Sequence, residues 1–216
     1  LKSYILLDVS GSMGFQGSGA MTKLRYGSVL AAALAFLMIK QRDSVGLVTF
    51  SDKMKSYVPP RSVQSQLKEI LKVLSSAEPS GVTITGDILH TLAERIPVRG
   101  LVVLISDLIV EPCELIHCLK HFRHNGHEVL VFHVLDPKEL NLDYSAETRF
   151  TDMETGRQLT TQPWHIRETY LSMMKERLSS LVHQMHDISV DYAKFTTDVP
   201  FDRALSEYLA KRKKLY

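Results

Sequence analysis

The sequence has little of several features that would place it in a specialised class of protein. It has two cysteines, Cys113 and Cys118, among 216 residues, too few for a disulfide framework, so we expect a reduced, cytoplasmic setting. A net charge of +2 gives no reason to expect nucleic acid or an anionic membrane as a partner. There is no internal repeat, low-complexity segment or interdomain linker. The remaining composition is that of a globular chain, with 44% hydrophobic and 23% charged residues.

The sequence also lacks a hydrophobic run long enough to cross a membrane. Its longest apolar stretch, Val29 to Ile39, falls short of the roughly 18 to 20 residues that a bilayer requires. Its internal position argues against a signal peptide, and we interpret it as a core helix covered on most sides. The chain begins with Leu1 and a strand follows almost at once, so we expect a fragment that lacks the N-terminal region of a longer protein.

Two common phosphate-binding motifs are missing, although a Gly-rich loop at residues 14–20 precedes a helix expected from about Thr22 to Lys40. A P-loop requires Gly-Lys followed by Ser or Thr at the start of the helix, whereas Lys23 lies between Thr22 and Leu24. The dinucleotide fingerprint fails because Thr22 stands where its third Gly should be. We therefore do not expect this loop to cradle phosphate.

What the sequence does contain is a regular alternation of strands and helices. Strands are expected at about residues 4–8, 44–50, 54–58, 101–107, 128–135 and 188–195, and helices at about 22–40, 64–74, 88–93, 112–124, 164–185 and 200–211. Pro59 and Pro60 favour the 54–58 strand as a short antiparallel edge strand. We predict an α/β fold, with a Rossmann-like, doubly wound, mostly parallel sheet and helices on both faces. It should form a single domain over residues 1–216, with a small hairpin insertion at about 148–160.

The first strand ends in polar residues that have two interpretations. Asp8, Ser10 and Ser12 follow the apolar run Tyr4–Leu7, at the carboxyl edge where open α/β sheets bind ligands. One carboxylate and two hydroxyls on a tight loop suit Mg²⁺ or Mn²⁺ better than zinc. Alternatively, the loop is a polar turn in which Asp and Ser satisfy backbone donors. This stretch alone leaves both interpretations open.

Two further stretches favour the metal loop. A second apolar strand ends in Ser106-Asp107, and a hydroxyl-rich loop at 79–87 leads into a helix. Because parallel strands bring their carboxyl ends to one edge, we expect five side chains to converge there: Asp8, Ser10, Ser12, Thr83 and Asp107. If the hydroxyls bind Mg²⁺ directly and the carboxylates hold waters, the ion stays poorly neutralised and should attract an external carboxylate. That is a binding mechanism and requires no catalysis.

The pattern Asp8-x-Ser10-x-Ser12, with a Thr in a later loop and Asp107 after an apolar strand, resembles the metal-ion-dependent adhesion site of von Willebrand factor A (vWA) domains. The resemblance implies that Ser10, Ser12 and Thr83 coordinate the metal directly. It also implies that Asp8 and Asp107 act largely through water.

Two residues depart from the wider vWA pattern. Val82 replaces the second Gly of the usual Gly-Gly-Thr, and Leu108 follows Asp107 where Gly is common. The first departure leaves Thr85 as a competing ligand, and we favour Thr83.

Further stretches resemble a bacterial vWA subfamily, domain-of-unknown-function family 58: residues 42–47, 106–108, 135–140, 152–156 and 197–200. The likeness covers essentially the whole chain. In that family the gene commonly neighbours one for a MoxR-type AAA+ ATPase, which implies that this ATPase or its client is a partner in chaperone-like assembly or maturation. Members usually carry an N-terminal extension that is sometimes membrane-anchored, so the full-length protein is expected to be longer.

Other sites compete with this interpretation. Cys113, His117 and His121 share one face of a predicted helix, but three ligands from one helix cannot readily surround a tetrahedral zinc or copper ion. A Gly-x-Ser-x-Gly elbow is missing, and the best catalytic alternative is a Mg²⁺-dependent phosphoryl transfer through Asp8. A structural vWA domain with a vacant metal site is a further alternative. We expect a non-catalytic, divalent-cation-dependent module whose ion takes an Asp or Glu from a protein partner.

Overall fold

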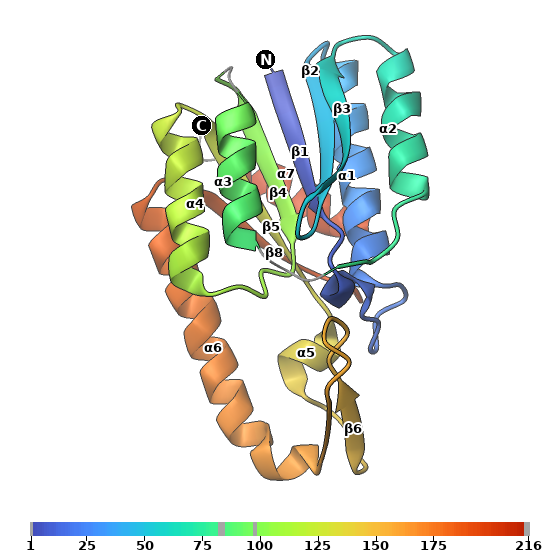
Figure 1. Ribbon diagram of the computed structural model, residues 1–216, viewed down its shortest axis with the longest axis vertical. Coiled ribbons are helices and arrows are strands. Elements are labelled where there is room, and N and C mark those ends of the chain that lie inside the picture. The colour runs from blue at the N-terminus through green and yellow to red at the C-terminus, as the bar shows by residue number, and fades with distance from the viewer. Residues whose placement is uncertain (1, 82–84, 97–98, 214–216) are drawn as a thin grey trace.

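The computed structural model describes residues 2–81, 85–96 and 99–213. In this part of the chain a six-stranded sheet has the order β3-β2-β1-β4-β5-β8, with helices on both faces (Figure 1). Its strands are β1 (Lys2–Asp8), β2 (Ser44–Phe50), β3 (Met54–Arg61), β4 (Leu101–Ser106), β5 (Glu128–Leu135) and β8 (Asp191–Thr196). The helices are η1 (Gly11–Gly14), α1 (Lys23–Lys40), α2 (Ser65–Ser75), α3 (Thr85–Arg95), α4 (Pro112–His124), α5 (Pro137–Asn141), α6 (Pro163–Asp187) and α7 (Phe201–Lys213). A separate hairpin joins β6 (Thr148–Thr151) to β7 (Gln158–Thr161).

The predicted fold class is confirmed. β1 lies between β2 and β4, and all sheet neighbours are parallel except β2 and β3. The predicted end of the edge strand at Val58 is wrong, because β3 continues through Pro59 and Pro60 to Arg61. Within the described sheet, β3 has a neighbour on one side only, so proline, which cannot donate a backbone hydrogen bond, is tolerated in it.

Alternate residues of the central strands pack on opposite faces of the sheet, which explains their continuous apolar runs. Leu6 belongs to a core with Leu89 of α3, Leu115 of α4 and Leu181 of α6. Ile5 and Leu7 belong to the other core, which contains residues from α1, α2 and α7: Leu30, Leu34, Ile70 and Leu205. The apolar stretch of α1 is therefore the predicted core helix, although Phe36 is half exposed. None of the described helices is both long and apolar enough to cross a membrane.

The structure adds a short helix where the sequence predicted only the end of a strand. Asp136 begins α5 with a capping box: its carboxylate accepts the N–H of Lys138 at 2.8 Å, and Glu139 accepts the N–H of Asp136 at 2.9 Å. In Figure 1, α5, the hairpin and η1 all lie beyond the carboxyl ends of the parallel strands. This arrangement places the start of α5 beside the predicted metal loop.

Asp136 also organises the Gly-rich loop before α1. Its buried carboxylate accepts the N–H groups of Gly17, Ser18 and Gly19 at 3.0, 3.1 and 3.2 Å, and the hydroxyl of Thr197 at 3.0 Å. A methyl group on Gly19 would lie 2.0 Å from the Thr197 hydroxyl, so no larger residue fits. Successive backbone N–H groups in such a loop form an anion-binding concavity. Here the anion is supplied by the protein's own carboxylate rather than by a phosphate.

We expect Asp136→Asn to lower the free energy of unfolding by about 2–3 kcal/mol, because it replaces a charged acceptor with an amide that also carries N–H donors. Urea unfolding should show this loss. The control Asp143→Asn, an exposed residue just after α5, should change stability by less than about 0.5 kcal/mol. Equal stability of Asp136→Asn and the native protein would show that this carboxylate does not hold the loop.

Candidate metal site at the carboxyl edge of the sheet

Asp8 and the first loop form a rigid group of oxygen atoms. Asp8 ends β1, and its two carboxylate oxygens accept the N–H of Ser10 at 2.8 Å and the hydroxyl of Ser106 at 2.6 Å. The Ser10 and Ser12 hydroxyl oxygens lie 3.1 Å apart. The structure therefore places three of the predicted site residues together, and hydrogen bonds from Ser10 and Ser106 hold the Asp8 carboxylate in place.

The electrostatic environment of Asp8 is short of positive charge. Burial and, to a smaller extent, the negative charge of Asp107 raise the pKa of Asp8 to about 6, although hydrogen bonds from Ser106 and Ser10 partly oppose this rise. A carboxylate that is costly to ionise in this setting would be stabilised by a nearby cation. The first loop therefore has the electrostatics expected of a cation site.

The hydroxyl-rich loop is bonded to the first loop. The N–H of Gly11 donates to the Gly81 carbonyl at 3.1 Å, and the N–H of Ser80 donates to the Val9 carbonyl at 2.8 Å. Gly81 has φ of +86°, which favours glycine. Thr83 and the side chain of Thr85 lie outside the described residues, so the choice between these two ligands stays a prediction.

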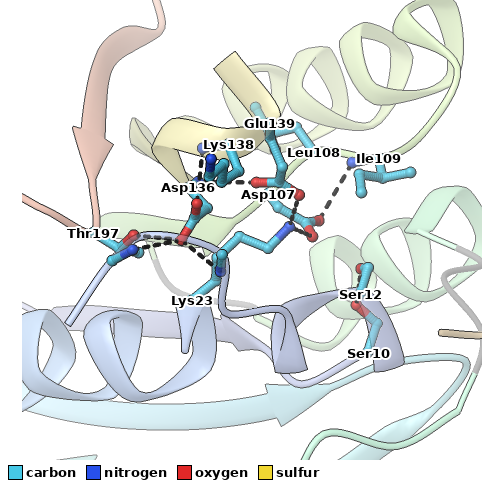
Figure 2. A network of polar contacts seen from close by, with 12 residues as sticks. Ser10, Ser12, Lys23, Asp107, Leu108, Ile109, Asp136, Lys138, Glu139 and Thr197 are labelled. Carbon is cyan, nitrogen blue, oxygen red and sulfur yellow. Dashed lines mark hydrogen bonds and ion pairs between the residues drawn. The ribbon is translucent and has the colours of Figure 1, made fainter. Parts of the chain in front are cut away.

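Asp107 has a partner that the sequence analysis missed. The Lys23 ammonium, from the first turn of α1, lies between Asp107 and Glu139, with 2.7 Å from Nζ to Asp107 Oδ2 (Figure 2). The Lys23 side chain is fully buried and also lies over the Phe15 ring, 5.8 Å from its centroid. Burial alone would lower the pKa of Lys23, but the charges of Asp107 and Glu139 raise it above its usual value. One of the two predicted carboxylates is thus already paired with a protein cation, which it shares with Glu139.

The position of Lys23 makes these carboxylates necessary for folding. A cation at the N-terminus of a helix faces the positive end of the helix dipole, and a buried ammonium without a counter-ion is strongly destabilising. Two features of the sequence involved residues of this ion pair: Lys23, which does not fit the P-loop pattern, and the Leu135–Leu140 stretch, which contains Glu139. Neither feature indicated that α5 would bring Glu139 to Lys23.

Leu108, which follows Asp107 where vWA domains commonly have Gly, adopts a backbone conformation that favours glycine. Leu108 has φ of +52°, in the left-handed region that glycine occupies most easily. Its N–H donates to the Ser106 hydroxyl at 3.0 Å, its carbonyl accepts from Arg177 at 3.1 Å, and its side chain is buried. These contacts compensate for the conformational cost of a side chain at this position.

Two hydroxyls and a buried carboxylate fit a magnesium site. Adjacent ligands in an octahedral site at about 2.0–2.1 Å from the ion lie about 2.9 Å apart, close to the 3.1 Å between the Ser10 and Ser12 oxygens. Because both oxygens of Asp8 already accept hydrogen bonds, this carboxylate fits the role of orienting a metal-bound water. Ser10 and Ser12 would hold the ion directly.

In the described ranges, no three or more His, Cys, Asp and Glu side chains form a group that could hold a metal. His90 of α3 joins the predicted helix face, with its Nδ1 2.8 Å from Nδ1 of His121 and its ring 5.1 Å from that of His117. Cys118 points elsewhere and donates to the Gly86 carbonyl.

Comparison with solved structures identifies the fold as that of a vWA domain. BatB from Bacteroides thetaiotaomicron has a TM-score of 0.61 and 17% identity, with 99% of each chain covered. An aerotolerance-related membrane protein from Bacteroides fragilis has a TM-score of 0.61 and 18% identity, covering 96% of this chain and 98% of that one. The SpRpn10 VWA domain has a TM-score of 0.52 and 13% identity, covering 97% and 94%. At these identities the likeness shows the fold alone.

The chain belongs to the family described as Protein of unknown function DUF58, whose model matches residues 1–179. Uncharacterized proteins of Mycobacterium tuberculosis (strain ATCC 25618 / H37Rv) and Mycobacterium bovis (strain ATCC BAA-935 / AF2122/97) are each 26% identical over 159 residues. The match covers 72% of this chain and 49% of each relative. The chain thus spans about half the length of the curated relatives that it matches.

We expect Lys23→Met to lower the free energy of unfolding by about 3–5 kcal/mol, because it leaves Asp107 and Glu139 without their shared cation. Urea unfolding at neutral pH measures the loss. Lys40→Met, at the exposed end of the same helix, is the matched control and should have a small effect. Adding Glu139→Gln to Lys23→Met should recover part of the loss, and unchanged stability of Lys23→Met would contradict the importance of this ion pair.

His133 of β5 should make the protein less stable in acid. Its Nε2–H donates to the Asp107 carbonyl at 2.9 Å, its Nδ1 accepts from the Tyr192 hydroxyl at 2.8 Å, and burial lowers its pKa to about 4. As the pH falls from about 6.5 to 4, the unfolded chain takes up a proton that the folded chain does not, so stability falls by up to about 3 kcal/mol. Urea unfolding at several pH values should show a shallower decline in His133→Gln, and equal slopes would contradict this assignment.

Proposed function

We propose that this chain is a non-catalytic protein-binding module that presents a divalent cation, Mg²⁺ or Mn²⁺, to an Asp or Glu side chain of a partner. The observation that carries this proposal is the Ser10–Ser12 hydroxyl pair, 3.1 Å apart and directly in front of the buried Asp8. The vWA fold supports a role in protein interaction in general. The Ser10–Ser12 hydroxyl pair supports the more specific proposal that this interaction depends on a metal ion.

The charge balance of the site favours an acidic partner. Asp107 is paired with Lys23, which it shares with Glu139, so Asp8 is the other carboxylate of the predicted set among the described residues. A divalent ion held by neutral hydroxyls beside a single anion keeps a net positive charge, which an incoming carboxylate can satisfy. Ile109, two residues after Asp107, is half exposed and would offer a partner an apolar contact near this site.

We further propose that the partner is a MoxR-type AAA+ ATPase or its client in an assembly or maturation system. Membership of DUF58 supports this partner class through the gene neighbourhood that is common in that family. The ATPase would then supply the energy, and this chain would supply metal-dependent recognition.

The contacts of Asp8 favour binding over phosphoryl transfer. A phosphoryl acceptor needs a carboxylate oxygen that can approach phosphorus in line with the leaving group. Both oxygens of Asp8 accept short hydrogen bonds inside the protein, and the side chain is buried. These contacts hold Asp8 for electrostatic support rather than for attack.

Adding MgCl₂ or MnCl₂ should raise the thermal unfolding midpoint, with a gain of about 2.7 kcal/mol when the ion is at 100 times its dissociation constant. Ser12→Ala should lose most of this gain because it removes a ligand, whereas Ser18→Ala in the exposed Gly-rich loop should keep it. No metal-dependent shift in the native protein would favour a structural domain with a vacant site.

Purified MoxR-type ATPase from the native host should be captured by the immobilised chain in Mg²⁺ and released by EDTA. Asp8→Ala should abolish this capture, and Asp143→Asn should not affect it. Phosphatase turnover that is lost in Asp8→Ala would instead support the phosphoryl-transfer alternative.

A further inference from the structure

The β6–β7 hairpin folds back onto the metal loop. Its strands have four residues each and are largely exposed, yet its turn is in close contact with η1. A methyl group on Gly11 would lie 3.0 Å from the Met153 carbonyl and 3.3 Å from Glu154 Cγ, and one on Gly14 would lie 3.1 Å from Met153 Cε. Figure 1 shows the hairpin beneath η1, beyond the carboxyl edge of the sheet. The absence of a side chain at Gly11 therefore makes room for the hairpin, and that at Gly14 makes room for both Pro79 and Met153.

The turn that carries Glu154 is built to hold a fixed shape. The Asp152 carboxylate accepts the N–H groups of Glu154 and Thr155 at 2.8 and 3.0 Å, and these bonds lower its pKa. The Asp152 backbone bonds to Arg157 and Gly156 at 2.8 and 2.9 Å, and Gly156 has φ of +71°. Such an Asx turn positions the residue two places further on. Glu154 is therefore held against the loop by backbone geometry.

Glu154 differs from its neighbours on the turn. It is half-buried, whereas Met153 and Thr155 are exposed. The residue that its Cγ approaches, Gly11, lies between the two serines of the hydroxyl pair. The carboxylate carbon is one bond beyond Cγ, roughly 1.5 Å, so the acidic group lies close to the backbone of the loop that carries both serines.

We propose that Glu154 is a carboxylate ligand, supplied within the same chain, for the divalent cation of this site. This inference rests on the proposed metal site and identifies one more of its ligands. Glu154 adds the negative charge that the Ser10–Ser12 pair lacks and takes the position that a partner's acid would otherwise occupy. A partner must then compete with the hairpin for the ion.

Titration with Mn²⁺ alone, followed by water-proton relaxation, tests the proposal. Glu154→Gln keeps the shape and the Cγ contact but removes the charge, so the dissociation constant for Mn²⁺ should rise about tenfold. The relaxation enhancement of the bound ion should rise by the amount expected for one additional exchangeable water. Glu147→Gln, an exposed residue just before the same hairpin, is the matched control and should match the native protein in both measurements.

The outcomes separate this inference from the proposed function. If the native protein binds Mn²⁺ in a Ser12-dependent way and Glu154→Gln leaves both the affinity and the relaxation enhancement unchanged, Glu154 is not a ligand and the metal site stands without it. If the native protein and Ser12→Ala bind Mn²⁺ equally weakly, the metal site itself is wrong and this inference is overturned with it. Weaker Mn²⁺ binding together with the extra water in Glu154→Gln supports the assignment.

Discussion

The buried ammonium of Lys23 is the interaction on which the site's geometry depends. It joins the start of α1 to Asp107 after β4 and to Glu139 of α5, three elements that come from distant parts of the chain. Burying an ammonium is costly unless anions surround it. The three elements must therefore assemble together, and the carboxyl edge of the sheet acquires a fixed arrangement of charge before any metal or partner is bound.

Asp136 fixes the position of the Gly-rich loop before α1 by hydrogen bonds. Its carboxylate accepts three successive N–H groups of the Gly-rich loop and the Thr197 hydroxyl. The N–H groups that a phosphate would need in this loop are therefore taken by a carboxylate of the protein itself. Because Asp136 also caps α5, the same residue positions Glu139 for its bond to Lys23.

The balance of charge at this edge determines how the site can work. Asp107 is paired with Lys23, Asp8 is buried behind two serine hydroxyls, and Glu154 approaches from the hairpin. If Glu154 binds the ion as we propose, an acid from a partner must compete with this carboxylate of the hairpin for the same position. A site arranged in this way favours reversible recognition, because the competing carboxylate reduces the gain from each contact.

Much of the fold follows from local sequence patterns. Continuous apolar runs predicted the central strands, and polar residues at their ends predicted which edge carries the site, because strand polarity alone places those ends together. The details that were missed involve contacts between distant segments. β3 passes through Pro59 and Pro60 because its outer edge has no partner in the described sheet. The helix α5 forms where the sequence predicted only the end of a strand.

The sequence by itself determined the class of fold and the residues Asp8, Ser10, Ser12 and Asp107 as members of one polar edge. Only the tertiary structure decided that Asp107 is bound by Lys23 and that Glu154 lies against Gly11. The physical reason is that strand and helix signals depend on neighbours a few residues apart. The pairing of buried charges instead depends on which side chains the folded chain brings within about 3 Å of each other, across 84 residues for Lys23 and Asp107.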